Sequence, residues 1–165
     1  MPLRCVVLCL LFLSIIALPA YSQWRFHASV DYLAPIMKRA DQYNYAIGGS
    51  IGAGMPISNA FELHATLGYT YLQGVRVEDH YLRYHMDDIT ALPLNLTFQY
   101  RIDQLFFLEV AGGPMLLTHP ASDFGSHYSA GGGIRYKRFE ISGRLMQWNT
   151  GGIINFAGLR LTTSL

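Results

Sequence analysis

The chain has 165 residues, which suits one domain, and its 12 basic and 11 acidic residues give a formal net charge of +1. A nearly neutral chain has no general electrostatic attraction for nucleic acid, so we exclude nucleic acid as a partner. Hydrophobic residues make up 51% of the sequence and 16 residues are glycine, yet no apolar run after the N-terminal segment is long enough for a membrane-spanning helix.

Residues 1–22 have the layout of a cleavable signal peptide. Arg4 supplies the positive charge near the start, residues 6–18 are almost entirely apolar, and small residues occupy the positions that precede a cleavage site. We therefore predict a signal peptide over 1–22 and a single mature domain over 23–165. Removal of the segment takes away both cysteines, so we expect no disulfide in the mature domain.

The mature sequence is dominated by alternation of apolar and polar residues, which is typical of strands with two different faces. In residues 61–71, for example, Leu63, Leu67 and Tyr69 share one face, whereas Glu62 and His64 share the other. The remaining segments with this pattern are 24–32, 45–55, 92–100, 106–116, 128–136, 139–146 and 157–162. We predict eight antiparallel strands and no helix beyond the signal peptide.

The connections between the predicted strands alternate in length. Long connections are expected near 34–44, 73–88, 117–127 and 148–153, and short ones near 56–59, 101–104 and 137–138. Outer-membrane barrels have short periplasmic turns and long extracellular loops. A chain that enters from the periplasm would reach a long loop first, and eight strands would return its end to the periplasm.

Alternation alone does not separate a membrane barrel from a soluble barrel with an apolar interior. The polar face here carries many small residues, such as Ser29, Gly48 and Ser50, which suit a crowded interior better than a water-facing surface. The apolar face carries tyrosines near strand ends, such as Tyr32 and Tyr136, as in the aromatic girdle of a lipid-facing band. We therefore predict an all-β fold, an eight-stranded antiparallel up-and-down transmembrane β-barrel preceded by a cleavable signal peptide.

The sequence resembles the small outer-membrane β-barrel proteins of the OmpA/OmpX-like type, in particular the porin-like barrels of Bacteroidetes-type bacteria. The residues that carry the likeness are ITALPLNLTFQY at 89–100, FLEVAGGPM at 107–115, SAGGGIRY at 129–136 and AYSQ at the cleavage site. The resemblance implies the outer membrane of a Gram-negative-type bacterium as the location. It also implies outer-membrane lipid around the barrel and the barrel assembly machinery as a partner during biogenesis.

The predicted inward face holds a group of ionisable residues, namely Arg25, Asp31, Glu62, His64, Glu109, Arg135, Glu140, Arg144 and Arg160. Arginines and carboxylates that face each other in a narrow barrel would form a hydrogen-bonded ion network. Such a network could act as a pore constriction or gate. It could equally act as a polar plug, because eight strands leave an interior just wide enough for side chains to fill. We favour the plug.

The external loops 34–44 and 73–88 are the expected contact regions for an extracellular partner. Within the second loop, the residues assigned to this contact are His80, Tyr81, Tyr84 and His85. Histidines and carboxylates lie close together there, but no zinc-type spacing occurs, so we predict no metal and no cofactor.

A lipid-modifying enzyme is a less favoured function. Ser126, His127, Ser129 and Asp123 would have to meet near one external strand end, and no nucleophile motif supports them. We predict no enzymatic activity and expect a structural, adhesive or interaction role through the external loops, above a polar plugged lumen. The sequence also leaves open a narrow porin-like channel for small solutes and a soluble ligand-binding barrel.

Overall fold

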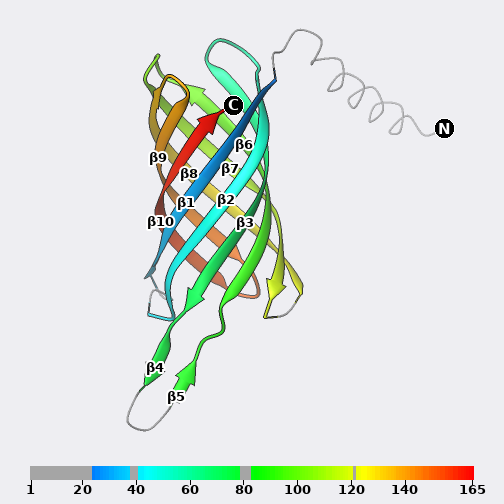
Figure 1. The fold of residues 1–165 in the computed structure, drawn as a ribbon, viewed down its shortest axis with the longest axis vertical. Helices are drawn as coiled ribbons and strands as arrows, with labels where there is room; N and C mark the ends of the chain where they lie inside the picture. Colours follow the sequence, from blue (N-terminus) through cyan, green and yellow to red (C-terminus); the bar gives the residue numbers. More distant parts are fainter. Residues whose placement is uncertain (1–23, 38–40, 79–82, 121) are drawn as a thin grey trace, which may run out of the picture.

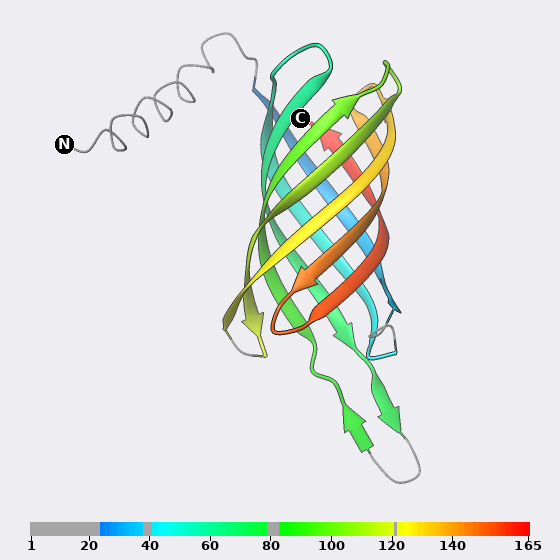
Figure 2. The same cartoon turned by 180° about the vertical axis from the view of Figure 1, so that it is seen from behind.

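The structure is a computed structural model that describes residues 24–37, 41–78, 83–120 and 122–165. Eight long strands form a closed barrel (Figures 1 and 2); they are β1 (Arg25–Ile36), β2 (Tyr43–Pro56), β3 (Phe61–Gly74), β6 (Ile89–Arg101), β7 (Phe106–His119), β8 (Asp123–Tyr136), β9 (Phe139–Asn149) and β10 (Ile153–Ser164). Two short strands, β4 (Arg76–Glu78) and β5 (Arg83–His85), pair only with each other in a hairpin that projects beyond the barrel. Within the described residues, no helix has the length and apolar character needed to cross a membrane.

Each long strand pairs antiparallel with the long strands before and after it in the chain, and β1 pairs with β10 to close the barrel. The fold is therefore an up-and-down barrel, and the predicted fold class is confirmed. We call the end at which β1 begins and β10 ends the terminal end, and the opposite end, from which the β4–β5 hairpin projects, the distal end (Figure 1). The predicted signal peptide, residues 1–22, lies outside the described residues.

All eight predicted strands are present, but the observed strands extend further at the distal end. The prediction of long connections at 117–127 and 148–153 was wrong, because β7 and β8 pair as far as Leu117 and Asp123, and three-residue connections remain at 120–122 and 150–152. The ladder of backbone hydrogen bonds continues where the outward residues become polar, so apolar alternation ends before the strand does. The short connections at the terminal end are confirmed.

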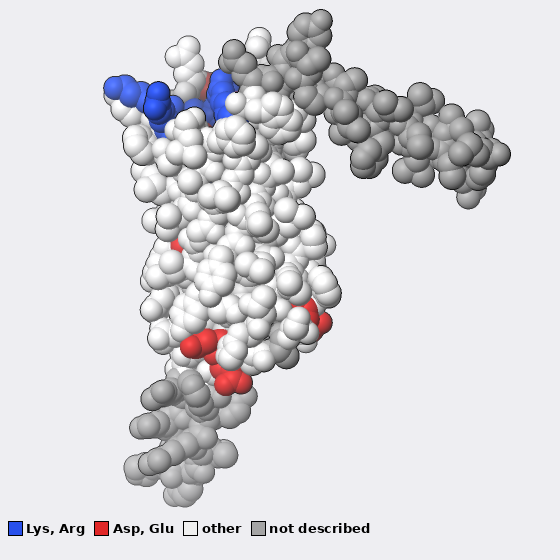
Figure 3. All heavy atoms as spheres, turned by 45° about the vertical axis from the view of Figure 1, so that its right-hand side comes forward, with Lys and Arg blue, Asp and Glu red and all other residues white. Residues whose placement is uncertain are grey.

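The apolar face of the strands points outward, as predicted. Ile51 is 68% exposed and Leu96 is 58% exposed, whereas Ser50 and Asn95, their neighbours in sequence, are buried inside the barrel. On the face shown in Figure 3, charged side chains gather at the two ends, and the surface between them is nearly free of charge. A broad exposed apolar band of this kind requires a covering partner, and in a barrel with outward tyrosines that partner is lipid.

Candidate functional site

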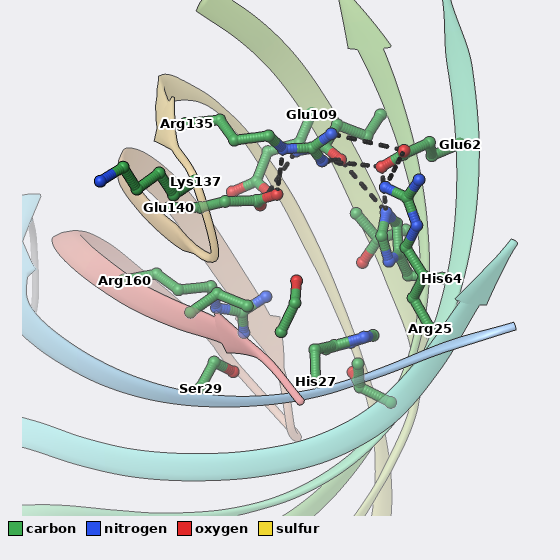
Figure 4. A pocket seen from close by; sticks show the side chains of 15 residues that line it. Arg25, His27, Ser29, Glu62, His64, Glu109, Arg135, Lys137, Glu140 and Arg160 are labelled. Atoms are coloured by element: carbon green, nitrogen blue, oxygen red, sulfur yellow. Dashed lines mark hydrogen bonds and ion pairs between the residues drawn. The ribbon is translucent and has the colours of Figure 1, made fainter. Parts of the chain in front are cut away.

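The lumen at the terminal end contains a cluster of charged residues around Glu62, which we call the Glu62 cluster. Strand ends from β1, β3, β6, β8 and β9 meet at this level and bring Arg25, Arg101, Arg135 and Glu140 together around Glu62. Figure 4 shows Arg25, Arg135 and Glu140 near Glu62. The buried Glu62 carboxylate accepts a hydrogen bond of 2.7 Å from Arg135 Nη2 and another from Arg101, and it lies 3.5 Å from Arg25 Nη1. Arg135 Nε donates to Glu140 Oε1 at 2.5 Å. Each carboxylate is thus neutralised by at least one guanidinium.

Neutral polar side chains connect the Glu62 cluster to the barrel wall. Gln99 accepts a hydrogen bond of 3.0 Å from Arg135 and donates one of 3.2 Å to Glu140. His64 Nε2 lies 3.1 Å from Gln99 Oε1, and its ring lies 5.1 Å from the ring of His27 in an edge-to-face arrangement. These contacts fix the amide and imidazole orientations, so the cluster is a cross-linked network and not a set of isolated ion pairs.

A second cluster, the Asp31 cluster, lies nearer the middle of the lumen and consists of Asp31, Ser129, Arg144 and Arg160. Asp31 accepts hydrogen bonds from Arg160 Nε at 2.8 Å and Arg160 Nη2 at 2.9 Å, and a third from Arg144 Nη1 at 3.2 Å. Arg144 also donates to Ser129 Oγ at 2.5 Å. All four residues are buried, so one carboxylate holds two guanidinium groups away from water.

Glu109 stands apart from both clusters. Its carboxylate is buried and accepts a hydrogen bond of 3.0 Å from Ser142 Oγ. It lines the same cavity as Glu62 and Arg135, a cavity of about 60 Å³ near the terminal end (Figure 4). The described residues include no group of three or more His, Cys, Asp or Glu side chains arranged to hold a metal ion.

The distal half of the lumen is filled by apolar side chains, which the sequence analysis did not anticipate. This apolar seal comprises Leu33, Tyr43, Ala46, Leu72, Ala91, Met115, Leu117, Met146, Trp148, Ile154 and Phe156. The rings of Trp148 and Phe156 are 5.0 Å apart, and Trp148 Nε1 donates to Met146 Sδ at 3.1 Å. The sequence analysis predicted a polar plugged lumen, and the structure adds an apolar filling in the distal half. The sequence did contain a signal for the apolar seal. The inward residues change from charged to apolar toward the distal end, from position 31 to 33 and from 144 to 146 and 148.

Little space remains between the Asp31 cluster and the apolar seal. The cavity at this level has a volume of about 10 Å³ and is lined by Asp31, His127, Trp148 and Arg160 among others. A cavity needs about 10–15 Å³ to hold one water molecule. The contents of the lumen are therefore packed side chains and not a continuous aqueous path through this level.

The nine residues assigned to the lumen all project into the barrel, and eight of them join the two clusters or their immediate network. Arg101 and Gln99 were missed, because Arg101 was assigned to a turn and Gln99 carries no charge. The inward alternation through Gln99 and Arg101 was the signal that could have found them. In the external set, Tyr84 and His85 belong to β5, whereas His80 and Tyr81 lie outside the described residues.

Ser126 and His127, a serine and a histidine considered for catalysis, are not brought together. Ser126 and His127 are consecutive on β8 and therefore project to opposite sides of the wall. His127 is fully buried in the lumen and forms a hydrogen bond with Asn95, while its Nδ1 has no hydrogen-bond partner among the described residues. Ser129 is bonded to Arg144. A serine–histidine pair of neighbouring side chains is thus excluded for Ser126 and His127.

The sequence matches no protein family model and no curated protein. Solved structures with a similar fold are the attachment invasion locus protein Ail of Yersinia pestis and the N-terminal β-barrel domain of Pseudomonas aeruginosa OprF. Ail has 12% identity and a TM-score of 0.57 over 86% of this chain and 96% of that chain. OprF has 15% identity and a TM-score of 0.50 over 87% of this chain and 100% of that chain. A designed transmembrane β-barrel has 11% identity and a TM-score of 0.54 over 86% of this chain and 95% of that chain. The chain therefore has the fold of the small transmembrane β-barrels.

Proposed function

We propose that the protein is an integral outer-membrane barrel with a closed lumen, and that it acts through the surface it presents beyond the membrane. The observation that carries the proposal is that two kinds of side chain fill the lumen, one after the other along its length. Ion clusters occupy the terminal and middle parts, and the apolar seal occupies the distal part. The role that fits a closed, rigid wall is structural, adhesive or in interaction with a partner, without catalysis.

Two barriers oppose the passage of a solute. An ion entering from the terminal end would have to displace the guanidinium groups of Arg144 and Arg160 from Asp31, which leaves buried charges unpaired. It would then have to shed its water to pass Trp148 and the other apolar side chains, as at a hydrophobic constriction that blocks conduction when dry. These barriers favour the closed barrel over a narrow porin-like channel.

Conductance across a planar bilayer tests the closed lumen. The mature barrel should insert without discrete conductance steps in concentrated potassium chloride. The triple variant Trp148→Ala, Phe156→Ala, Arg144→Ala is the positive control, because it removes the two large rings of the apolar seal and one of the two guanidinium groups held by Asp31, and so lowers both barriers. Steps from the wild-type protein that match those of this control would overturn the closed barrel in favour of the channel.

Membrane insertion has its own test. A folded transmembrane barrel resists the detergent used in gel electrophoresis, so unboiled and boiled samples should migrate differently, and the protein should fractionate with outer membranes. A chain extractable in buffer would be a soluble barrel. Export by residues 1–22, assembly by the barrel assembly machinery and origin in a Bacteroidetes-type bacterium stay predictions.

The β4–β5 hairpin is the proposed contact region for an extracellular partner. Its strands β4 and β5 project farther from the barrel than the connection at 150–152 (Figure 1), and they pair only with each other. The name of Ail, the attachment invasion locus protein, supports an adhesive role for a barrel of this shape. Replacement of 76–85 by Asn-Gly should abolish adhesion of expressing cells while the gel shift persists. Unchanged adhesion would exclude the hairpin, and an alteration confined to 150–152 is the matched control.

A further inference from the structure

The turn between β8 and β9 carries two cations that have no counter-ion among the described residues. Lys137 and Arg138 form this two-residue connection at the terminal end, and both are exposed. Neither side chain forms an ion pair with any residue in the described part of the chain. Arg25 and Arg101, two other cations at the same end, are already engaged with Glu62. The uncommitted positive charge of this rim is therefore concentrated in one turn.

The backbone of this turn does not suit a lysine. Lys137 has φ of 56°, in the left-handed region. Two-residue hairpin turns place their first residue there, and glycine or asparagine is favoured because a side chain strains the backbone. Turn formation alone therefore gives no reason for a lysine at this position. A strained residue that a better turn former could replace indicates a role for its side chain.

Aromatic residues flank the two cations and fix their depth. Tyr136 and Phe139 precede and follow the turn, and both are exposed on the outer wall. Lys137 Nζ lies 5.2 Å from the centroid of the Tyr136 ring. Tyrosines of an outward girdle lie at the level of the lipid headgroups. Lys137 and Arg138 follow directly beyond that level, where the phosphates of the adjacent leaflet are found.

We propose that the Lys137–Arg138 turn binds the phosphate of an anionic phospholipid in the leaflet at the terminal end. The proposal rests on the membrane insertion proposed above. An arginine can form two parallel hydrogen bonds with a phosphate, and a lysine adds a compact positive charge that adapts to the remaining oxygens. The adjacent Tyr136 ring packs against the lipid glycerol region and shields the pair from water. The uncompensated charge of the turn selects an anionic headgroup over a zwitterionic one.

The test compares unfolding of the mature barrel in vesicles of phosphatidylcholine and in an equimolar mixture with phosphatidylglycerol. Two cations near an anionic surface should raise the folding equilibrium constant about thirty-fold in the mixture. The variant Lys137→Gly, Arg138→Asn should fold in both vesicles, because glycine suits the left-handed backbone. Its gain, the rise in the folding equilibrium constant from phosphatidylcholine to the mixture, should be under about threefold. The variant Arg25→Gln, which removes a cation bound to Glu62, should keep the wild-type gain.

Each other outcome has a defined meaning. An equal gain in the turn variant and the wild type overturns the proposal, as does the absence of any gain in the wild type. Stabilisation of the wild type by inorganic phosphate in phosphatidylcholine vesicles, to the same extent, overturns the lipid as the source of the phosphate. Failure of the wild type to fold in either vesicle, seen as no gel shift, contradicts membrane insertion itself and is thereby distinguished from failure of the turn.

Discussion

Substitution of Asp31 by asparagine is the most direct test of the reasoning about the lumen. The change keeps the size of the side chain but removes the charge that holds Arg144 and Arg160. One face of the new amide would direct N–H groups toward guanidinium donors. Arg144 is 3% exposed and Arg160 is 7% exposed, so water cannot replace the lost partner. Breaking a buried pair in this way costs about 3–5 kcal/mol, which lowers the folded-to-unfolded ratio about 100-fold or more.

Urea unfolding in detergent micelles, followed by tryptophan fluorescence, measures this cost because Trp148 lies in the lumen. Asp41→Asn is the matched control, since Asp41 is exposed at the distal end, and its free energy of unfolding should change by less than about 0.5 kcal/mol. The triple variant Asp31→Leu, Arg144→Met, Arg160→Met should recover most of the loss, because an apolar replacement of a whole buried ion group is often neutral. A loss below about 1 kcal/mol for Asp31→Asn would refute a dry, paired cluster.

Three further predictions concern the wall, the seal and the turns. Alanine at Gly133 should destabilise the barrel by about 2 kcal/mol or more, because its Cβ would overlap the Ile141 carbonyl oxygen, whereas Gly143→Ala, with open space around the Cβ, should change the urea midpoint little. Trp148→Ala should cost about 3–5 kcal/mol; because this change removes the fluorescent reporter, its unfolding in urea is followed by far-ultraviolet circular dichroism, and a near-zero cost would mean that the apolar seal does not pack as a core. Hydrogen bonds from the backbone N–H groups of Phe106 and Leu105 lower the pKa of Asp103. Its charged form therefore stabilises the fold above about pH 4 and ceases to do so as pH falls through the lowered folded pKa. The stability difference between wild type and Asp103→Asn should accordingly shrink in acid, and a constant difference from neutral pH to acid would contradict it.

The strands and their faces were predictable because the two sides of this wall meet different surroundings. Alternation in segments such as 61–71 and 92–100 places lipid-facing and lumen-facing residues on opposite sides, and no tertiary information is needed to interpret it. The distal extensions were not predictable in the same way. Beyond the lipid both sides of a strand can be polar, so Thr118 and His119 look like loop residues although they continue β7.

The ion clusters were partly predictable, whereas their partners were not. The charges of Asp31, Arg144 and Arg160 identified inward positions, but the sequence does not contain the register that brings residues from β1, β9 and β10 to one level. The apolar seal was not predicted from the sequence, for a different reason. Around Trp148 the inward residues Met146 and Trp148 are apolar whereas the outward residues Gln147 and Asn149 are polar, so the relation between polarity and face that holds in the rest of the wall is reversed there.

The lumen is filled by ion clusters at one end and by apolar side chains at the other, because the two kinds of filling need different conditions to close a narrow barrel. Arginine and glutamate side chains reach across the barrel, so they can fill it only where neighbouring inward residues are small, as at Ser50 and Gly131. Such a network remains stable only if every charge keeps its partner, and the terminal end is open to water through the cavity beside Glu62. Phe156 needs no hydrogen-bond partner and Trp148 needs one only for its indole N–H, which Met146 supplies, so these rings exclude water by packing without any ion pair. Placing them distal to Asp31 keeps water away from that cluster on one side, which strengthens its ion pairs. The apolar seal and the Asp31 cluster should therefore lose stability together, because a cavity made at Trp148 admits water to Asp31. In the double variant, the losses in free energy of unfolding caused by Trp148→Ala and by Asp31→Asn should be less than additive.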